Sequence, residues 1–472
     1  MRLIVIQDMN ELPAYYQDIK SFGDNALSKH SSHVIDALME WFVSFRSDDD
    51  TTFAAKRGIN FLGRKSVLSS LFFILMYHGD TLIAFAPLFR FKVHLGDTPT
   101  GYEVISFCPD STIFFYNDIL LKSGFEPRAL QAFVDFFRDY NKADPYIVLL
   151  NHIPSSSGTL PLLLKHSMGL LPHGFNVGTS PVFWRGGVYP WNLGKLQSTL
   201  QNAYDSGAFS DTARASIRTA IEKITTANRP MLVFKKNHLP LKSYIYKVFS
   251  EGGPSDSLFD LYNAIEALFQ SHPVKYPYLA LPESPDDFVN SLSAGKRYYY
   301  QRYRKQFLAD NGHFVKLRGN SIAGQDIDEF ITLHRERWGA NSNILNKMTA
   351  SFIFSFLKQL ALNGHLTLFF ACHESRRIAS MCCIDLNGRR EFLSSGRSLN
   401  DEKLRAGKLL LFEAIIDSIN DGLRVFDFGY GDEAYKSDFN WSYVTNNVIA
   451  LSHNLHPRQF ANIMPLYEEV LL

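Results

Sequence analysis

Residues 391–441 read EFLSSGRSLNDEKLRAGKLLLFEAIIDSINDGLRVFDFGYGDEAYKSDFNW, and this stretch decides the fold. Residues 391–395 have the composition of a short strand, and residues 423–428 have that of a second one. Between them, the apolar residues from Leu409 to Ile419 recur at the spacing of one helix face, and Gly422 ends that helix. The connection is long enough for the crossover that parallel strands require. The sequence therefore predicts a strand, loop, helix, strand unit followed by a polar and aromatic turn.

The start of this helix, Arg405-Ala406-Gly407-Lys408, has the features of a phosphate site. The first backbone N–H groups of a helix have no partner inside it, and the helix dipole favours negative charge there. Gly407 would let a ligand approach the backbone closely, and Arg405 and Lys408 could add charge-assisted hydrogen bonds. The alternative is that Gly407 only shapes a loop and that both cations are solvated. These four residues alone leave the two interpretations open.

Two other phosphate-binding motifs do not fit the sequence. A Walker loop needs a second glycine before the Gly-Lys pair and a Ser or Thr after the lysine, whereas Leu409 follows Lys408. The segment from Gly429 to Ala434 matches G-x-G-x-x-A, but its Asp432 and Glu433 would repel a pyrophosphate. A P-loop is therefore excluded, and a dinucleotide site is disfavoured.

Three motifs resemble those of a known family. Residues 426–436 read FDFGYGDEAYK and are followed by Phe439 and Trp441, while residues 330–338 and 292–297 read FITLHRERW and LSAGKR. In this order and spacing they resemble the acetyltransferase domain of BioF-type and cellulose-biosynthesis (CelD-like) proteins. Those proteins belong to the GNAT superfamily and are distantly related to the Fem (FemAB-like) aminoacyl ligases.

The resemblance extends over roughly residues 276–451 and implies a bacterial enzyme. It implies a GNAT-type acyltransferase that moves an acyl group from acetyl-CoA or another acyl-CoA to an amine or a hydroxyl. The implied acceptor is a small molecule, or a glycan- or lipid-linked precursor of the cell envelope or of an exopolysaccharide. One motif departs from the family pattern. The usual GNAT pyrophosphate loop has Arg or Gln before its glycine and Gly or Ala after it, where this sequence has Leu404 and Leu409.

The first half of the chain repeats the predicted order of the second. Two apolar runs flank a turn at His78, and a similar pair flanks a turn at His373. Counted from His78 to His373 the offset is 295 residues, and it is the same from Ala84 to Ala379. A period this long indicates two domains of one fold rather than a solenoid. We therefore predict an α/β (α+β) fold of tandem GNAT-like domains, each a mixed twisted sheet flanked by helices.

The first of these domains is predicted to be degenerate. Its equivalent helix begins Glu126-Pro127-Arg128-Ala129, which lacks a glycine and brings a carboxylate to the place where a phosphate would bind. The predicted division is a degenerate N-terminal domain over 1–172, a partly helical insert or linker over 173–272, and the CelD-like acyltransferase domain over 273–472. We expect only the last to bind an acyl donor.

Composition and charge disfavour several classes of protein. The 472 residues include 48 Lys plus Arg and 47 Asp plus Glu, so no global charge favours nucleic acid or an anionic membrane. The longest apolar run, Leu71 to Tyr77, is too short for a membrane span, and no signal peptide is expected. We expect a cytoplasmic protein without a metal, because its cysteines have no metal-ligand spacing. These are Cys108, Cys372, Cys382 and Cys383.

Acyl transfer needs a base for the acceptor proton, hydrogen-bond donors for the developing oxyanion and an acid for the leaving thiolate. The candidate catalytic residues are Asp427, Asp432, Glu433, His334, Tyr435 and Lys436. The candidate cofactor-binding residues are Arg405, Ala406, Gly407 and Lys408, with the backbone N–H groups of Cys383 and Ile384. Structural roles are also open: the carboxylates can cap turns, Glu433 can pair with Lys436, and His334 can be a satisfied helix residue. No cysteine has a recognisable histidine partner, which argues against a covalent route.

Residues 296–305, KRYYYQRYRK, form the most basic and aromatic segment of the chain. They could stack on a nucleic-acid strand, but the balanced net charge favours an amphipathic helix with solvated cations and packed tyrosines. The predicted acceptor-binding residues are Arg297, Arg337 and Trp338. Two alternatives remain. One is a Fem-like transferase that uses aminoacyl-tRNA, with this segment binding the tRNA, and the other is a non-catalytic GNAT scaffold in polysaccharide biosynthesis. The sequence does not fix the oligomeric state.

Overall fold

The computed structural model describes most of both halves of the chain. The described residues are 1–25, 34–45, 66–93, 102–107, 114–140, 146–159, 161–163, 175–179, 201, 204–205, 218, 275–339, 342, 344–345, 352–429 and 435–453. The predicted insert over 173–272 lies almost entirely outside them. The boundaries proposed from the sequence therefore stay a prediction.

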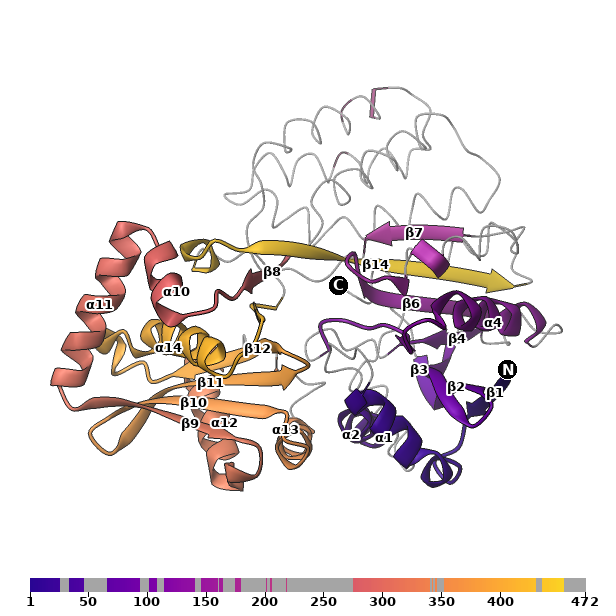
Figure 1. Cartoon of the computed structure of the whole chain (residues 1–472), viewed down its shortest axis with the longest axis horizontal. Helices are drawn as coiled ribbons and strands as arrows, with labels where there is room; N and C mark the ends of the chain where they lie inside the picture. Colours follow the sequence, from indigo (N-terminus) through magenta and orange to yellow (C-terminus); the bar gives the residue numbers. More distant parts are fainter. Residues whose placement is uncertain are drawn as a thin grey trace.

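The first half is a sheet with helices on its faces (Figure 1). Strands β1 to β4 pair in antiparallel order, and β4 then pairs in parallel with β6 after the crossover helix α4. The strands are β1 (Arg2–Ile6), β2 (Ser66–His78), β3 (Thr81–Val93), β4 (Tyr102–Ser106), β5 (Leu120–Leu121), β6 (Tyr146–Pro154) and β7 (Phe175–Thr179). The helices are the 3-10 turn η1 (Leu12–Ala14), α1 (Tyr16–Asn25), α2 (Ile35–Phe45) and α4 (Glu126–Asp139).

The second half has the same order of elements. Strands β9 to β12 pair in antiparallel order, and β12 pairs in parallel with β13 after the crossover helix α14. The strands are β8 (Lys275–Ala280), β9 (Gly312–Arg318), β10 (Leu366–His373), β11 (Arg376–Leu386), β12 (Arg389–Arg397), β13 (Val425–Asp427) and β14 (Ser442–His453). The helices are α10 (Pro285–Ser291), α11 (Ala294–Ala309), α12 (Gly324–Trp338), α13 (Ile353–Leu362), α14 (Ala406–Asn420), and the 3-10 turns η5 (Gly319–Ser321), η7 (Glu402–Leu404) and η8 (Lys436–Asp438).

The tandem α/β architecture predicted from the sequence is confirmed. The β2–β3 hairpin turns at Gly79, whose φ is 59°, and the β10–β11 hairpin turns at Glu374, whose φ is 55°. These residues stand 295 positions apart, as the sequence repeat requires. A left-handed backbone at the same turn position shows that the two hairpins close in the same way, although only Gly79 adopts it without steric cost.

The last strand joins the two halves into one sheet. Residues Ser442 to Thr445 of β14 pair with β8 of the second half, whereas residues Asn446 to His453 pair with β6 and β7 of the first. Figure 1 shows β14 running across both halves. Among the described residues, all strands therefore belong to a single sheet of fourteen.

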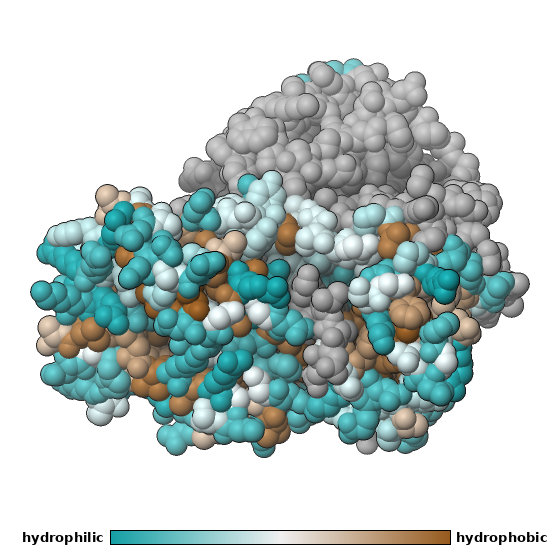
Figure 2. Space-filling model, viewed as in Figure 1, coloured by the Kyte–Doolittle hydropathy of each residue, from teal (hydrophilic) through white to brown (hydrophobic). Residues whose placement is uncertain are grey.

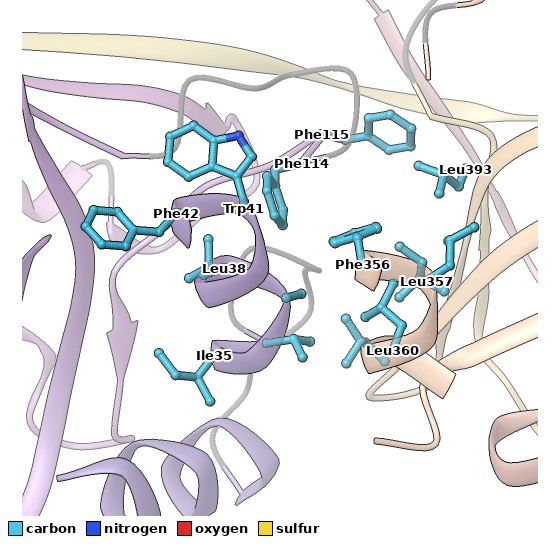
Figure 3. Packing of buried hydrophobic residues seen from close by; sticks show 14 of the residues in the cluster. Ile35, Leu38, Trp41, Phe42, Phe114, Phe115, Phe356, Leu357, Leu360 and Leu393 are labelled. Atoms are coloured by element: carbon cyan, nitrogen blue, oxygen red, sulfur yellow. The ribbon is translucent and has the colours of Figure 1, made fainter. Parts of the chain in front are cut away.

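A shared apolar core also binds the halves together. Helix α2 of the first half packs against α13 of the second, and Phe114 meets Phe356 edge to face at 5.7 Å between ring centroids (Figure 3). The next residue, Phe115, lies so close to Gly429 that a Cβ there would come within 2.8 Å of its ring. The segment around Phe114 thus inserts between the halves, where both contribute buried area.

A buried ionic cluster fixes the crossover helix of the second half to its sheet. The guanidinium of Arg390 is fully buried and bonds Asp385 on β11, Asp417 on α14 and Asp421, the C-cap residue of α14, at 2.7 to 3.0 Å. Lys316 of β9 also pairs with Asp417 and Asp421. Because each buried charge has opposite charges around it, the cluster holds α14 in one position over the strands.

One described face of the molecule is mainly polar. Figure 2 shows a face on which hydrophilic residues predominate, with apolar residues scattered among them. Within the described part of the chain, no helix is both long enough and apolar enough to cross a membrane.

Candidate functional site

Helix α14 begins without the usual cap. Its N-cap residue, Arg405, has a left-handed backbone with φ of 56° and gives no side-chain cap. By contrast, α10 and α11 begin with Ser284 and Ser293, whose hydroxyls accept backbone N–H bonds. The N–H groups of Ala406 and Gly407 have no partner among the described residues. The first turn of α14 is therefore free to bind an anion.

Gly407 leaves open space above this turn. A Cβ built on Gly407 would meet only Arg397 Cδ, at 3.8 Å, which is an ordinary contact. The backbone of Gly407 is not left-handed either. Neither packing nor conformation thus requires a glycine here, which is consistent with a glycine kept for close approach of a ligand.

The two cations predicted at this helix start have partners in the protein. The guanidinium of Arg405 lies over the ring of Tyr303, at 4.2 Å from its centroid, and near Tyr299. Lys408 pairs with Asp438 at 2.5 Å and lies over Tyr299. These contacts hold both side chains beside the helix start, so they contribute positive potential there even before a ligand binds.

Asp438 is the counter-charge of this group. Its nearly buried carboxylate binds Lys296 as well as Lys408. Burial opposes its ionisation, but the hydrogen bonds from the two lysines hold the pKa of Asp438 below its usual value. One carboxylate therefore faces two ammonium groups, and the surroundings of the helix start keep a net positive charge.

Strand β12 has a free edge beside this helix start. Its ladder with β13 covers only Arg389 to Glu391, after which the two strands separate. Farther along, Ser395 O accepts a hydrogen bond from Trp338 Nε1 at 2.9 Å, and Ser395 Oγ accepts one from Arg337 Nη1 at 2.6 Å. The end of α12 and the first turn of α14 thus both lie beside the free edge of β12. Arg397 of β12 lies against Gly407 in that first turn.

His334 is fixed in a neutral state. It is buried, its Nδ1 lies 3.2 Å from Ser395 O, and its Nε2 lies 2.7 Å from Ser342 Oγ. Ser395 O can only accept, so Nδ1 carries the proton, and the hydroxyl of Ser342, which also accepts a backbone N–H bond from Leu345, donates to Nε2. Burial lowers the pKa of His334 to about 4, against the bond to Ser395. Both ring nitrogens are thus occupied, which makes His334 a weak base in this arrangement.

Asp427 bonds the two halves together. Its carboxylate is fully buried, pairs with Arg389, accepts the Tyr116 hydroxyl at 2.8 Å and accepts Gly429 N at 2.8 Å. Burial disfavours the charge on Arg389, but the neighbouring carboxylate raises its pKa above the usual value. Asp427 is therefore held by three donors, an arrangement that suits a structural anion better than a base.

The other predicted catalytic residues lie in or beside the turn that follows β13. Asp432 and Glu433 lie outside the described residues. Tyr435 is half-buried and interacts electrostatically with Arg337. Lys436 is buried, with its ammonium 5.9 Å from the ring centroid of Tyr435. Of these residues, the structure thus brings Tyr435 to the group formed by α12 and β12.

Cys383 and Ile384 require a correction. They were predicted to offer backbone N–H groups to a cofactor, but β11 is an interior strand with β10 on one side and β12 on the other. Such a strand has no free edge to offer a ligand. The strand with a free edge is β12. Burial also raises the pKa of both Cys382 and Cys383, which keeps these thiols neutral and unreactive.

The three predicted acceptor-binding residues do not lie together. Arg337 and Trp338 share Ser395 as a partner, and the guanidinium lies 4.5 Å from the indole centroid. Arg297 instead donates to the carbonyl oxygens of Asn290 and Leu292 at the end of α10. Only the pair on α12 belongs to the group beside β12.

Ser395 and Arg397 were not among the site residues predicted from the sequence. Both lie on β12 after the point where it separates from β13. Nothing in the spacing of the sequence shows where a parallel ladder stops, so these positions could not be chosen. No group of three or more potential metal ligands occurs among the residues that the structure describes.

Comparisons with known proteins agree with this geometry at the level of a domain. Residues 294–437 match the family model of the acetyltransferase (GNAT) domain. No sequence among the curated proteins matches the chain. The match of residues 294–437 to the GNAT family model supports the GNAT resemblance that the motifs indicated.

Solved structures of similar architecture have little sequence in common with the chain. L-PGS from Bacillus licheniformis is 9% identical, with 97% of this chain and 96% of that chain covered and a TM-score of 0.43. FemX is 12% identical, with 93% and 98% covered and a TM-score of 0.30. A tandem GNAT protein from the clavulanic acid biosynthesis pathway is 9% identical, with 96% and 98% covered and a TM-score of 0.31. At these values the similarities do not identify a function.

Proposed function

We propose that the protein is an acyltransferase with acyl-CoA as its donor, because residues 294–437 match the family model of the acetyltransferase (GNAT) domain. The acceptor amine or hydroxyl attacks the thioester carbonyl directly. A bond from nitrogen or oxygen to the acyl carbon forms, the bond from carbon to sulfur breaks, and the thiolate leaves with a proton.

The observation that carries this proposal is the uncapped first turn of α14. Two free N–H groups, at Ala406 and Gly407, point out of a helix whose start is surrounded by cations. The CoA diphosphate is an anion that fits such a turn. The leucines at the outer positions of the loop remove two family contacts, and Arg405 and Lys408 supply charge close by.

The free edge of β12 supplies the rest of the site. A donor held at α14 would extend its pantetheine arm along the strand edge that β13 leaves open after Glu391. Backbone N–H groups of that edge would then stabilise the oxyanion. Tyr435, which is half-buried and interacts electrostatically with Arg337, is the residue we propose to protonate the leaving thiolate.

The first half acts as a structural partner in this proposal. Its crossover helix α4 begins with Glu126, a carboxylate at the position where the second half has an uncapped turn. A phosphate would be repelled there. The segment containing Phe114 and Tyr116 instead packs on α13 and on the end of β13. We therefore propose that only the second half binds the donor.

For the acceptor, we propose a precursor of the cell envelope or of an exopolysaccharide, small or linked to a glycan or lipid. This rests on the resemblance of residues 426–436 to CelD-like proteins. Mass spectrometry of a small-molecule extract incubated with the protein and isotopically labelled acetyl-CoA tests it. We expect one class of labelled amine or hydroxyl compound. Absence of any labelled product across extracts, with free CoA not released, would favour a non-catalytic scaffold.

An aminoacyl-tRNA donor is the second candidate, and one surface favours it. On α11, Arg302 lies over the rings of Tyr298 and Tyr303. Arg405, the N-cap residue of α14, also lies over the ring of Tyr303. Alternating rings and cations of this kind can stack on unpaired bases. Filter binding of tRNA over a range of salt concentrations decides between the donors. Tight, strongly salt-dependent binding would favour the tRNA donor.

A further inference from the structure

Arg337 is the unusual arginine of the second half. It is half-buried, yet the one hydrogen bond that its guanidinium makes to the described residues goes to the neutral hydroxyl of Ser395, at 2.6 Å. No carboxylate of the described residues pairs with it. Four other buried or half-buried arginines of this half do have such partners: Arg304 with Glu413, Arg377 with Asp326, Arg389 with Asp427, and Arg390 with Asp385. Arg297 also lacks a carboxylate partner, but its guanidinium donates to two backbone carbonyl oxygens.

The surroundings of Arg337 raise the free energy of its charge. Burial, together with the neighbouring positive charge of Arg397, lowers the pKa of Arg337 below its usual value. A partly desolvated guanidinium with unused N–H donors gains most from an oxyanion, which forms charge-assisted and often bidentate hydrogen bonds with it. The second cation, Arg397, is only partly neutralised by the exposed Glu402. The local charge is therefore positive and favours an anionic ligand.

The geometry around Arg337 is fixed before any ligand binds. Ser395 Oγ holds one guanidinium nitrogen, and Arg337 Cζ lies over the indole of Trp338, 4.5 Å from its ring centroid. Trp338 is in turn held by its Nε1 bond to Ser395 O, while 38% of its surface stays exposed. A fixed guanidinium loses little side-chain entropy on binding, and the exposed indole can pack on the apolar or sugar part of a ligand.

We infer that Arg337, Trp338 and Ser395 form a binding site for an oxyanion, a carboxylate or a phosphate, carried by the acceptor. That this ligand is the acceptor rests on the proposed function. The protein would then have two separate anion sites. The donor diphosphate binds the first turn of α14 at Ala406 and Gly407. The acceptor oxyanion binds at the end of α12, beside the strand edge where the thioester would lie. The reaction would then select acceptors that carry an amine or hydroxyl together with an acidic group.

Binding of simple anions tests the site directly. The protein is titrated with inorganic phosphate and, separately, with acetate, each against sodium chloride at equal ionic strength, and tryptophan fluorescence is recorded because Trp338 lies against Arg337. We expect saturable binding of one or both anions, with the tighter of the two identifying the acceptor group. Arg337→Met is expected to weaken that binding at least tenfold. Arg337→Lys, which keeps the charge and loses the planar fork, is expected to weaken it less.

The matched control is Arg335→Met, an exposed arginine on the same helix, which is expected to bind like the unchanged protein. The thermal midpoint of each variant shows whether it folds, and Arg337→Lys carries the test should Arg337→Met not fold. If every Arg337 variant binds the anions as tightly as the unchanged protein does, the inference is overturned. A response to chloride as strong as that to phosphate and acetate would also overturn it.

Repeating the titration with saturating CoA, and with Gly407→Glu, separates the two anion sites. We expect the anion affinity to change by less than twofold in both cases. If CoA abolishes the phosphate binding that depends on Arg337, Arg337 belongs to the donor site and the inference is overturned. If CoA does not bind at all, the proposed function fails, whereas loss of anion binding in Arg337→Met still supports the oxyanion site.

Discussion

Tyr116 of the first half donates its hydroxyl proton to the buried carboxylate of Asp427 in the second half, at an O···O distance of 2.8 Å. Burial and this carboxylate together raise the pKa of Tyr116 well above its usual value, so the hydroxyl keeps its proton. Asp427 also binds Gly429 N, at the start of the turn that follows β13. The first half thus reaches the end of the strand on which the proposed site depends.

Removing this hydroxyl should destabilise the whole chain. A hydrogen bond to a buried charge contributes about 2 kcal/mol, so we expect Tyr116→Phe to lower the free energy of unfolding by about that amount. Chemical denaturation measures it. Tyr443→Phe, at a tyrosine that is half exposed, is the control and should change stability by less than about 0.5 kcal/mol. Equal values for the two variants would show that the bond between the halves contributes nothing.

Gly396 should not tolerate a side chain. A Cβ there would lie 2.3 Å from His334 N and 2.4 Å from Leu333 C, both backbone atoms of α12. Helix α12 would have to move away from β12, so we expect Gly396→Ala to cost about 3 kcal/mol. Gly407→Ala is the matched control, because its Cβ has 3.8 Å of clearance to Arg397. Circular dichroism melts compare the two, and a Gly396→Ala variant as stable as Gly407→Ala would contradict the packing described.

The neutral state of His334 should make the protein sensitive to acid. Its pKa is lowered by burial from 6.5 to about 4, so the unfolded chain binds more protons than the native one between these values. Stability is therefore lost as the pH falls through this window. We expect His334 to account for about 2 kcal/mol of the loss between pH 7 and pH 5.

Urea denaturation at pH 7 and pH 5 measures this contribution. In His334→Gln, the difference between the two pH values should shrink by about the same 2 kcal/mol. His152, whose pKa burial lowers to about 3, remains in both proteins and contributes equally to each. An unchanged pH difference in the variant would mean that His334 is charged or exposed in the folded protein.

Local patterns predicted the second half well. The strand expected over 391–395 is β12, the helix stripe from Leu409 to Ile419 is α14, and the strand expected over 423–428 is β13. The repeat at an offset of 295 residues is real in space, because both hairpins turn at the equivalent residue. These features depend on neighbours within a few residues, which is the range over which periodicity and turn chemistry act.

Features that depend on distant contacts were not predicted. Nothing near Tyr116 in the sequence indicates Asp427. The β12–β13 ladder ends at Glu391 and so leaves Ser395 available, whereas Cys383 is paired between β10 and β12. The passage of β14 from one half to the other is of the same kind. Such pairings follow from tertiary packing, which local propensity does not encode.

The central claim is that the uncapped turn of α14 binds the diphosphate of an acyl-CoA. Isothermal titration calorimetry with acetyl-CoA tests it on three proteins: the unchanged chain, Gly407→Glu and Gly295→Glu. Gly295 is the matched control, since it is the second residue of α11, as Gly407 is of α14, and a Cβ there meets nothing within 4 Å. We expect the unchanged chain and Gly295→Glu to bind equally and Gly407→Glu to bind at least about tenfold more weakly, a loss of about 1.4 kcal/mol. No binding by the unchanged chain, or equal binding by Gly407→Glu, would contradict the claim.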